Sequence, residues 1–566
     1  MRSIIASERT IWGVLAVIRL INAMLIQTYF VPDEFWQSVE VAHKMVFKYG
    51  YLTWEWRVGI RGFAYPLVFA TAYHLLAMAG LDYRILLIKL PYLLQGILAS
   101  IGDLFLFRLS RRLSGHAVAQ WTLLCSLLSW FMAYCCTRTL TNSTEMVLVT
   151  MALYYFPWPS LPGGNLKTFT LLAATAVIVR PTSAVLWLPL CTWQLIQCKS
   201  ENLKASLRIY FLIGLSVLGM STIIDRIFYE HWVVAPLNFM QFNIMSGGSS
   251  FYGTNPWHWY FSQGIPAVLG VNVVPFLLGI RCSNTKIPLL LIIWFTAVLS
   301  FLPHKEFRFL LPVLPLSMHY CGEYLHSISI ITRQSCKKDG KVAVAVEEKR
   351  SDVQEYSWAN SYKIHRKLPD VKPHDSIESS QKLNAKLFKS DKRFNSKKAY
   401  KVKCTILLLG TFNLLPFLYF SLIHQRGTVD VMNYLHNVAL NQTLDNGTMA
   451  VNDLNFMFLM PCHSTPYYSF LHFNVSMRFL TCEPNLNQRN DYKDEAEIFF
   501  LDPNKWLIDE YKCKGCKLPT HIVYFNSLEE NIFEFLMQNR YQKCAQYFHS
   551  HIPEGRIGSH VIVSCR

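Results

Sequence analysis

The sequence predicts a mainly α, polytopic integral membrane protein that ends in a small mixed α/β domain. Of its 566 residues, 52% are hydrophobic and only 16% are charged, whereas soluble domains carry about 25% charged residues. Several apolar runs approach the roughly 20 residues that a helix needs to cross the hydrocarbon core. Residues 425–566, in contrast, contain short strand-like stretches. An ordinary soluble enzyme is therefore disfavoured.

The apolar runs predict about 11 to 13 transmembrane helices. The clearest runs are residues 11–30, 116–136, 207–224, 264–280, 287–303 and 404–423. Weaker runs are residues 64–81, 85–107, 146–157, 169–179, 185–198 and 309–330. The first run is too long for a signal peptide and no small-residue cleavage site follows it, so we expect it to be retained.

Basic loops orient the chain, because short loops rich in Lys and Arg stay in the cytosol. Such turns lie at residues 108–112, 199–204 and 281–286. Residues 333–401 carry 18 Lys and Arg against 9 Asp and Glu, about half of the net charge of +17, and show almost no apolar periodicity. They are typical of a disordered cytosolic loop. A nucleic-acid-binding segment is the weaker alternative, since aromatic interleaving and repeats are absent.

These loops divide the chain into five predicted parts. They are a cytosolic N-terminus (1–10), a multi-span domain (11–332) with a luminal first loop (31–63), a basic loop (333–402), a last transmembrane helix (403–424) and a luminal C-terminal domain (425–566). This topology needs an odd number of crossings between residues 64 and 107, where two candidates lie. One of the two must be re-entrant, split or interfacial.

The C-terminal domain has features of an oxidising compartment. It contains three glycosylation sequons, at Asn441, Asn446 and Asn474, and six cysteines. Cys513 and Cys516 have the spacing of a redox or zinc pair, but no second pair accompanies them, so a structural disulfide is the favoured interpretation. The cysteine pairing stays open.

The first loop opens with adjacent carboxylates, Asp33 and Glu34, in the motif PDEFWQSVE. An acidic pair at this point commonly caps a helix. A carboxylate at the hydrocarbon boundary is also desolvated, which raises its pKa and suits it to accept a proton. The two interpretations are equally supported by the residues alone, and the second makes the pair a candidate catalytic site.

The motif HKEFRF, residues 304–309, lies between two apolar runs on the same side of the membrane. Its cations could contact lipid headgroups. Alternatively, Lys305, Arg308 and His304 stabilise a phosphate leaving group while Glu306 orients one of them or contacts the substrate. Both interpretations place a phosphate beside these cations.

Two further clusters are candidate substrate contacts. Arg138 and Glu145 flank hydroxyl side chains in TRTLTNSTE. Trp257 and His258 lie in FYGTNPWHWYFSQG, where aromatic faces could hold a sugar or simply pack at the interface. Arg180, before a proline at the end of an apolar run, is either an anion contact or an interfacial anchor.

The sequence gives no sign of a bound cofactor. It contains neither a phosphate-binding glycine loop followed by Lys nor a dinucleotide motif, and the membrane part has no close His or Cys cluster with metal-ligand spacing. We therefore expect no cofactor and no metal, and an activated substrate that is carried by a lipid.

Four motifs carry a family resemblance: PDEFWQSVEVAHKMVFKYGYLTWEW, IRGFAYPLVFA, TRTLTNSTE and HKEFRFLLPVLPL. They resemble the membrane-embedded mannosyltransferases of glycosyltransferase family 22, in the GT-C superfamily. FYGTNPWHWYFSQG, FLMPCHSTPYYSFLH and HIPEGRIGSH look most like the members that add the third mannose of glycosylphosphatidylinositol (GPI). The resemblance covers nearly the whole chain except the basic loop.

This resemblance implies a GT-C fold in the endoplasmic reticulum membrane, with the active site facing the lumen. It implies dolichyl phosphate mannose as donor and the second mannose of a GPI precursor as acceptor, joined in α1,2 linkage. The essential acid of the first loop matches Asp33, with Glu34 beside it. A β-linked donor and an α-linked product require one inverting displacement, in which Asp33 takes the proton of the acceptor hydroxyl.

Two alternatives remain. A sibling enzyme that extends the dolichol-linked precursor of N-glycans shares the acid of the first loop and the HKE motif. A lipid or solute transporter also has many spans, but transporters often contain internal repeats and polar groups near mid-membrane. Here no repeat is seen and the polar motifs gather at one edge, so a mannosyltransferase is favoured.

Overall fold

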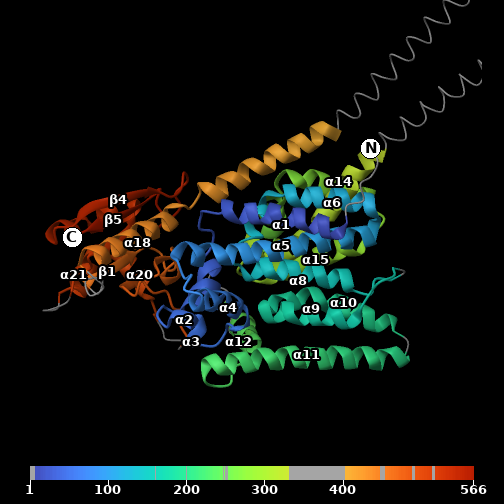
Figure 1. Cartoon of the computed structure of the whole chain (residues 1–566), viewed down its shortest axis with the longest axis horizontal. Helices are drawn as coiled ribbons and strands as arrows, with labels where there is room; N and C mark the ends of the chain where they lie inside the picture. The colour runs from blue at the N-terminus through green and yellow to red at the C-terminus, as the bar shows by residue number, and fades with distance from the viewer. Residues whose placement is uncertain are drawn as a thin grey trace, which may run out of the picture.

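The computed structural model describes residues 7–566 except 160, 199, 246–247, 249–250, 252, 331–401, 447–452, 487–490 and 513–516. The predicted basic loop, residues 1–6 of the predicted N-terminus and the Cys513–Cys516 pair lie outside the described residues. The chain forms a bundle of long helices with a smaller α/β domain at one end (Figure 1).

The bundle contains the apolar segments that the sequence indicates. Its helices are α1 (Glu8–Leu25), α5 (Arg84–Ser114), α6 (His116–Leu128), α7 (Trp130–Cys135), α8 (Thr141–Tyr155), α9 (Leu166–Val179), α10 (Ala184–Gln197), α11 (Ser200–Tyr229), α13 (Ile265–Leu269), α14 (Val273–Cys282), α15 (Ile287–Phe301), and helices at 314–330 and 402–422. Four described helical segments are long and apolar enough to cross a membrane: Arg84–Ser114, Asn202–Tyr229, Tyr260–Cys282 and Val402–Leu444. The predicted polytopic, mainly α fold is confirmed.

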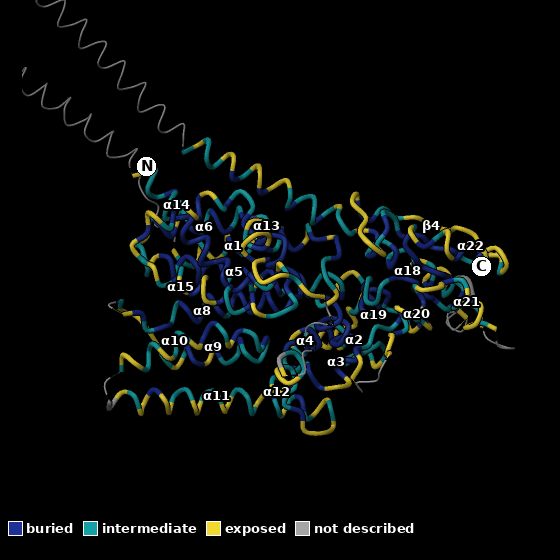
Figure 2. The backbone as a smooth tube through the Cα atoms, turned by 180° about the vertical axis from the view of Figure 1, so that it is seen from behind, coloured by how far each residue is buried: buried dark blue, intermediate teal, exposed yellow. Residues whose placement is uncertain are grey.

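Exposed apolar side chains on the rim of the bundle fit a lipid environment. Along α11 they include Phe211, Leu215 and Met220, which are more than half exposed. Figure 2 shows α11 as the outermost helix of its side, largely intermediate and exposed. In water such a surface would be a large apolar patch, whereas acyl chains cover it without cost.

A buried ion pair ties three of the bundle helices together. Arg19 of α1 donates from Nε to Asp103 of α5 at 2.6 Å, and Ser126 of α6 donates to the same carboxylate at 3.2 Å. Arg19 and Asp103 are almost fully buried, so each charge depends on the other for compensation.

The two apolar runs between residues 64 and 107 differ in length and position. The first forms α4 (Ala64–Met78), 15 residues or about 22 Å long, which is shorter than a hydrocarbon core of about 30 Å. It lies beside α2 (Glu40–Phe47) at the end of the bundle, in both views (Figures 1 and 2). The second forms α5, whose 31 residues run through the bundle. By length and composition, α5 is the candidate span of the two, which agrees with the odd number of crossings that the sequence predicts.

The connection between α1 and α5 builds a compact layer at this end. It contains the π-helical turn η1 (Phe35–Val39), α2, α3 (Trp54–Arg57) and α4. The layer is completed by α12 (Ala235–Met240) and the short turns η2 (Pro181–Ser183), η3 (Gln241–Met245), η5 (Tyr260–Gly264) and η7 (Phe307–Val313). The turn η6 (Gly270–Asn272) lies inside the bundle between α13 and α14, where Asn272 contacts Asn413. π-Helical turns occur frequently at functional sites, and η1 begins two residues after Asp33.

The C-terminal domain is a mixed five-stranded sheet of order β2-β1-β3-β5-β4 between two helical layers. Its strands are β1 (Asn455–Leu459), β2 (Ser476–Phe479), β3 (His521–Phe525), β4 (Gln542–Phe548) and β5 (His560–Cys565), and its helices are α18 (Gly427–Asn446), α19 (Tyr468–Leu471), α20 (Glu495–Leu501), α21 (Pro503–Glu510) and α22 (Glu529–Gln538), with the turn η9 (Asn526–Leu528). β1 pairs parallel with β2 and β3, whereas β5 is antiparallel to both its neighbours. The predicted α/β domain is confirmed.

Two disulfides give the cysteine pairing that the sequence left open: Cys462–Cys482 and Cys544–Cys565. Both join segments about 20 residues apart, so each closes a short loop of the domain. The sequon residues Asn441 and Asn474 are exposed on this domain.

Glu40 of α2 joins the C-terminal domain to the first loop. Its carboxylate accepts hydrogen bonds from the backbone N–H of Tyr467 at 2.7 Å and of Ser469 at 3.1 Å, and from the Ser469 hydroxyl. Trp36 of the first loop packs in the same apolar cluster as the strand residues Phe456 and Val523. The first loop and the C-terminal domain therefore share one core.

Candidate functional site

A cavity of about 560 Å³ lies where the bundle, the first loop and the C-terminal domain meet. Each of these three parts contributes side chains to its wall. The lining residues are Val31, Pro32, Asp33, Trp36, Gln37, Thr53, Trp54, Glu55, Arg61, Arg180, Phe239, Asn243, Phe251, His304, Glu306, Arg308, Phe309, Cys462, His463 and Cys482. Its wall combines aromatic rings with three arginines and three carboxylates.

Asp33 and the HKEFRF motif come together in this cavity. Oδ2 of Asp33 lies 2.6 Å from Nη1 of Arg308, and Arg308 also pairs with both carboxylate oxygens of Glu306. His304 Nε2 lies 2.8 Å from Oε1 of Glu306. Two segments about 270 residues apart in the sequence thus form one chain of charged groups.

The charges of this chain stabilise one another. Burial alone disfavours the ionised form of Glu306, but Arg308 and His304 outweigh it and lower the pKa of Glu306 below its usual range. Asp33 and Glu306 likewise overcome the effect of burial on Arg308 and raise its pKa. At neutral pH the cavity therefore holds an ionised Glu306 beside a charged guanidinium.

Two further arginines extend the positive wall. Arg180 stacks over the ring of Phe309, with Cζ 4.6 Å from its centroid, and its Nε lies 3.4 Å from Glu145. Arg61 pairs with Glu55 at 2.7 Å. Sequence reasoning missed Arg61 and Glu55 as site residues, although Arg61 lies within the quoted IRGFAYPLVFA motif and is a cation in the same loop as Asp33.

Glu34 and Arg138 require a correction, because the structure places neither in the cavity. They form a fully buried ion pair of 2.8 Å, and both side chains are 0% exposed. Tyr92 donates to the other carboxylate oxygen of Glu34, and Arg138 also donates to Thr28. Successive residues of a helical turn point about 100° apart, so Glu34 faces the core although Asp33 faces the cavity. A pair buried in this way has no surface left for substrate.

Lys305 is also displaced from its predicted role at a phosphate. It is buried, and its Nζ donates to the backbone carbonyls of Leu302 at 2.6 Å and Asn255 at 2.8 Å. The backbone is extended at Glu306, and side chains alternate along an extended segment. His304 and Glu306 therefore face the cavity, whereas Lys305 points away from it and stabilises the loop through its two hydrogen bonds.

Trp257 and His258 lie outside the cavity wall. Trp257 is 70% exposed, and His258 is exposed and contacts Ser262 through Nδ1 at 3.1 Å. The aromatic side chains that line the cavity come instead from the first loop and from the bundle, among them Trp36, Trp54 and Phe309. Trp257 and His258 are therefore not brought together with Asp33 in this cavity.

We expect Trp257→Ala to change the activity of the protein by no more than about twofold, since a surface substitution away from the cavity alters free energies by about 0.5 kcal/mol. Steady-state kinetics in membranes with equal amounts of protein check this result. Trp54→Ala, within the cavity wall, is the matched comparison and should lower activity far more. A tenfold loss for Trp257→Ala would return this side chain to the substrate site.

The C-terminal domain contributes His463 and the Cys462–Cys482 disulfide to the wall. Burial lowers the pKa of His463 to about 4, with Asp33 opposing the shift. The histidine is therefore neutral at pH 7. Its ligand atoms and those of the two cysteines lie within 4.8 Å of one another, but the sulfurs are bonded to each other and so do not form a thiolate metal site.

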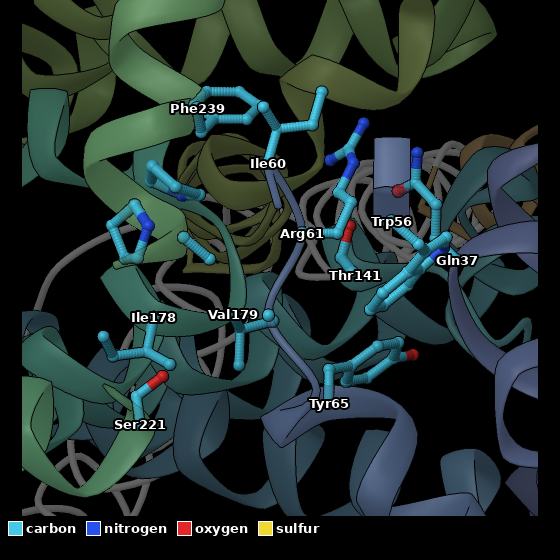
Figure 3. Close-up of a pocket in the computed structure, with 14 residues that line it drawn as sticks. Gln37, Trp56, Ile60, Arg61, Tyr65, Thr141, Ile178, Val179, Ser221 and Phe239 are labelled. Carbon is cyan, nitrogen blue, oxygen red and sulfur yellow. The ribbon is translucent and has the colours of Figure 1, made fainter. Parts of the chain in front are cut away.

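A second cavity of about 30 Å³, large enough for about one water molecule, adjoins the first through Gln37, Arg61 and Phe239. Figure 3 shows Phe239 and Ile60 on one side of Arg61, and Gln37 and Trp56 on the other. Ile178 and Val179 close its apolar end. This chamber lies between the charged cavity and the Ile178–Val179 end of α9.

The arrangement can perform two kinds of chemistry. Asp33 is a carboxylate at the cavity surface that can accept a proton from a bound hydroxyl. Arg308, Arg180 and Arg61 can stabilise an anion, since guanidinium groups match the geometry of phosphate oxygens. A proton acceptor beside an anion site is suited to transferring a group away from a phosphate.

Comparisons with known proteins agree with this chemistry. The profile of the Alg9-like mannosyltransferase family matches residues 10–472. GPI alpha-1,2-mannosyltransferase 3 of Bos taurus is 40% identical, with 96% of this chain and 87% of the relative covered. The protein of that name from Danio rerio is also 40% identical, covering 98% and 89%, and that from Homo sapiens is 38% identical, covering 96% and 85%.

A solved structure shares the fold. ArnT from Cupriavidus metallidurans, in a crystal structure bound to undecaprenyl phosphate, matches with a TM-score of 0.55 at 11% sequence identity. The similarity covers 98% of this chain and 97% of ArnT. The match spans the helical bundle and the C-terminal domain together.

Proposed function

The chain belongs to the Alg9-like mannosyltransferase family, and from that premise we propose that it adds the third mannose of a GPI precursor, in α1,2 linkage, at the luminal face of the endoplasmic reticulum membrane. The observation that carries the proposal is the similarity, over nearly the whole chain, to relatives named GPI alpha-1,2-mannosyltransferase 3. The acid and arginine cavity supports it by supplying the chemistry that such a transfer needs.

We propose dolichyl phosphate mannose as the donor. Arg308, Arg180 and Arg61 form a cavity wall that suits one phosphate group. ArnT, which has the same fold, was crystallised with a lipid phosphate.

The proposed reaction is a single inverting displacement. The acceptor hydroxyl oxygen forms a bond to the anomeric carbon of the donor mannose while the bond from that carbon to the phosphate oxygen breaks. Asp33 takes the hydroxyl proton, and both electrons of the broken bond leave with dolichyl phosphate. The arginines stabilise the negative charge on the departing phosphate, which therefore needs no proton at that moment.

The other predicted residues take supporting roles in this proposal. Glu306 and His304 hold Arg308 in place at the cavity surface. Lys305 fixes the backbone of the loop through its bonds to carbonyl oxygens. The buried Glu34–Arg138 pair anchors the turn that presents Asp33, so we assign these two residues to positioning.

We expect Arg308→Lys to lower kcat/KM for the donor by about 10²-fold to 10³-fold, as for the loss of one electrostatic contact to a developing anion. Lys keeps the positive charge, but it cannot contact Asp33, Glu306 and a phosphate at once. Kinetics with varied dolichyl phosphate mannose measure the effect. Arg281→Lys, on an exposed site at the end of α14, is the control, and equal kinetics for the two variants would remove Arg308 from the donor site.

The proposed topology has its own test. We propose that the N-terminus and residues 333–402 lie in the cytosol, and that residues 425–566 lie in the lumen and carry glycans at Asn441, Asn446 and Asn474. Each glycan should add about 2–3 kDa that endoglycosidase removes, so Gln variants of the three asparagines should lose mass stepwise. Protease added to sealed microsomes should cut the 333–402 segment and spare residues 425–566. Cleavage of the C-terminal domain would contradict the orientation.

The function itself is tested by complementation. In cells that lack their own third-mannose transferase, expression of the chain should convert the accumulated two-mannose GPI precursor into the three-mannose form. The new residue should be released by an α1,2-specific mannosidase. The alternative, a sibling enzyme of the N-glycan pathway, predicts unchanged GPI intermediates and restored dolichol-linked oligosaccharides in the corresponding mutants.

A further inference from the structure

One turn of the C-terminal domain is built into the cavity beside Asp33. The turn, residues 461–465, follows β1 and brings His463 and Cys462 to the cavity wall. Tyr29 donates its hydroxyl hydrogen bond to the carbonyl of His463, and Trp36 Nε1 donates to the carbonyl of Thr465 at 3.1 Å. These two donors flank Asp33 in the sequence, so the turn is fixed to the segment that carries the acid.

The imidazole of His463 is held firmly but keeps its polar atoms available. Its ring lies between two aromatic rings, with centroids 4.6 Å from Trp36 and 5.2 Å from Phe479. Among the described residues, neither ring nitrogen of His463 has a hydrogen-bond partner. A polar edge that lines a cavity without a protein partner is suited to a ligand.

The backbone of the turn is specialised to present this side chain. His463 adopts φ of 60°, a left-handed conformation that is unfavourable for a non-glycine residue. The Cys462–Cys482 disulfide, directly beside it, ties the turn to the segment that follows β2. Strained residues held by a rigid surrounding are concentrated at functional sites.

We propose that His463 binds a hydroxyl group of the acceptor's terminal mannose, so that the C-terminal domain forms part of the acceptor site. The inference deepens the proposed function and rests on it. His463 would orient the sugar whose hydroxyl gives its proton to Asp33 and attacks the donor, and it would act as a binding residue with no proton transfer of its own.

Charge and position favour the acceptor sugar over the donor phosphate. His463 is neutral at pH 7, so one ring nitrogen donates and the other accepts, which matches a hydroxyl group. The phosphate is better matched by the arginines, which come from the first loop and the bundle. Trp36 adds an aromatic face at the same wall, as carbohydrate sites commonly do.

The test compares three variants of the full-length protein in microsomes. His463→Phe keeps a ring between Trp36 and Phe479 but removes both nitrogens, so KM for the two-mannose GPI acceptor should rise about three- to tenfold while KM for the donor stays the same. His463→Asn, which tolerates the left-handed backbone and restores a hydrogen-bonding group, should recover part of the loss. His231→Gln, on an exposed loop, is the control.

A second measurement does not depend on transfer. Methyl α-mannoside, titrated into the purified protein, should change the tryptophan fluorescence of the cavity saturably, and His463→Phe should weaken this binding by a similar factor. If transfer to the GPI acceptor is absent but mannoside binding depends on His463, the proposed function fails and the sugar contact stands. If transfer occurs and the variant leaves the acceptor KM unchanged, or shifts both KM values alike, the role of His463 is overturned. Absence of both transfer and binding overturns both proposals.

Discussion

Asp33→Asn is expected to lower kcat by about 10²-fold to 10⁴-fold, the range that a positioned general base contributes. The amide has nearly the shape of the carboxylate but cannot accept the proton of the acceptor hydroxyl. The effect should fall on kcat and on kcat/KM together, because proton removal belongs to the transition state. Transfer from dolichyl phosphate mannose to a two-mannose GPI precursor in microsomes measures it.

The surrounding structure makes this substitution interpretable. Arg308 keeps its contacts with Glu306 when Asp33 loses its charge, so the guanidinium stays compensated. Asp33 is also at the cavity surface, with 20% of its side chain exposed, so no buried charge is left alone. The variant should therefore fold and reach wild-type abundance.

Asp453→Asn is the matched control. Asp453 is 79% exposed, lies on the C-terminal domain and pairs with Lys517 at 2.9 Å. Its loss should leave transfer within about twofold of the wild type. If Asp33→Asn retains the activity of this control, another group accepts the proton and the catalytic assignment is wrong.

Arg138→Met is expected to destabilise the protein by about 3–5 kcal/mol, because it leaves the buried carboxylate of Glu34 without its counter-ion. The arginine contributes more than its charge. It donates to the carbonyl of Thr28 at 2.8 Å and of Tyr134 at 3.0 Å, and it stacks over the ring of Tyr134 with Cζ 4.2 Å from the centroid. Thermal unfolding of the detergent-solubilised protein measures the loss.

A double-mutant cycle separates this structural role from a direct role at the substrate. Glu34→Gln removes the buried charge and keeps the hydrogen bond from Tyr92, so combining it with Arg138→Met should cost clearly less than the sum of the two single changes. Donor and acceptor KM values of the folded Glu34→Gln protein should stay close to the wild type. Unchanged stability together with a large rise in either KM would place the pair at the substrate instead.

The candidate site shows which site residues local sequence patterns can predict and which they cannot. Asp33 and Arg308 are recognisable in sequence because each is a charged residue where an apolar run ends, on the same predicted side of the membrane. Their neighbours Glu34 and Lys305 look equally suitable by composition. The direction of a side chain depends on the backbone at that residue, and the helical turn at Glu34 and the extended segment at Glu306 turn these two groups away from the cavity.

Contacts between residues far apart in the sequence could not be predicted from the local motifs. Arg61 and His463 lie about 400 residues apart and line one cavity, and Glu40 joins the first loop to a turn near residue 468. Trp257 shows the converse, since its aromatic motif suggested a sugar site but its exposed ring does not line the cavity with Asp33. Motif composition reports what a segment can bind, whereas packing decides which segments meet.

The sequence by itself determined that the chain is a polytopic, mainly α membrane protein with an α/β domain at its C-terminal end and a mannosyltransferase resemblance. The length of an apolar run and the presence of a family motif are local properties of the sequence, so they can be recognised without a structure. Only the tertiary structure decided that α5 runs through the bundle while α4 lies at its end, that Glu34 and Arg138 are a buried pair, and that His463 joins Asp33 at one cavity. These results depend on which side chains pack against one another and exclude water. That packing is set by the whole fold and not by a local segment.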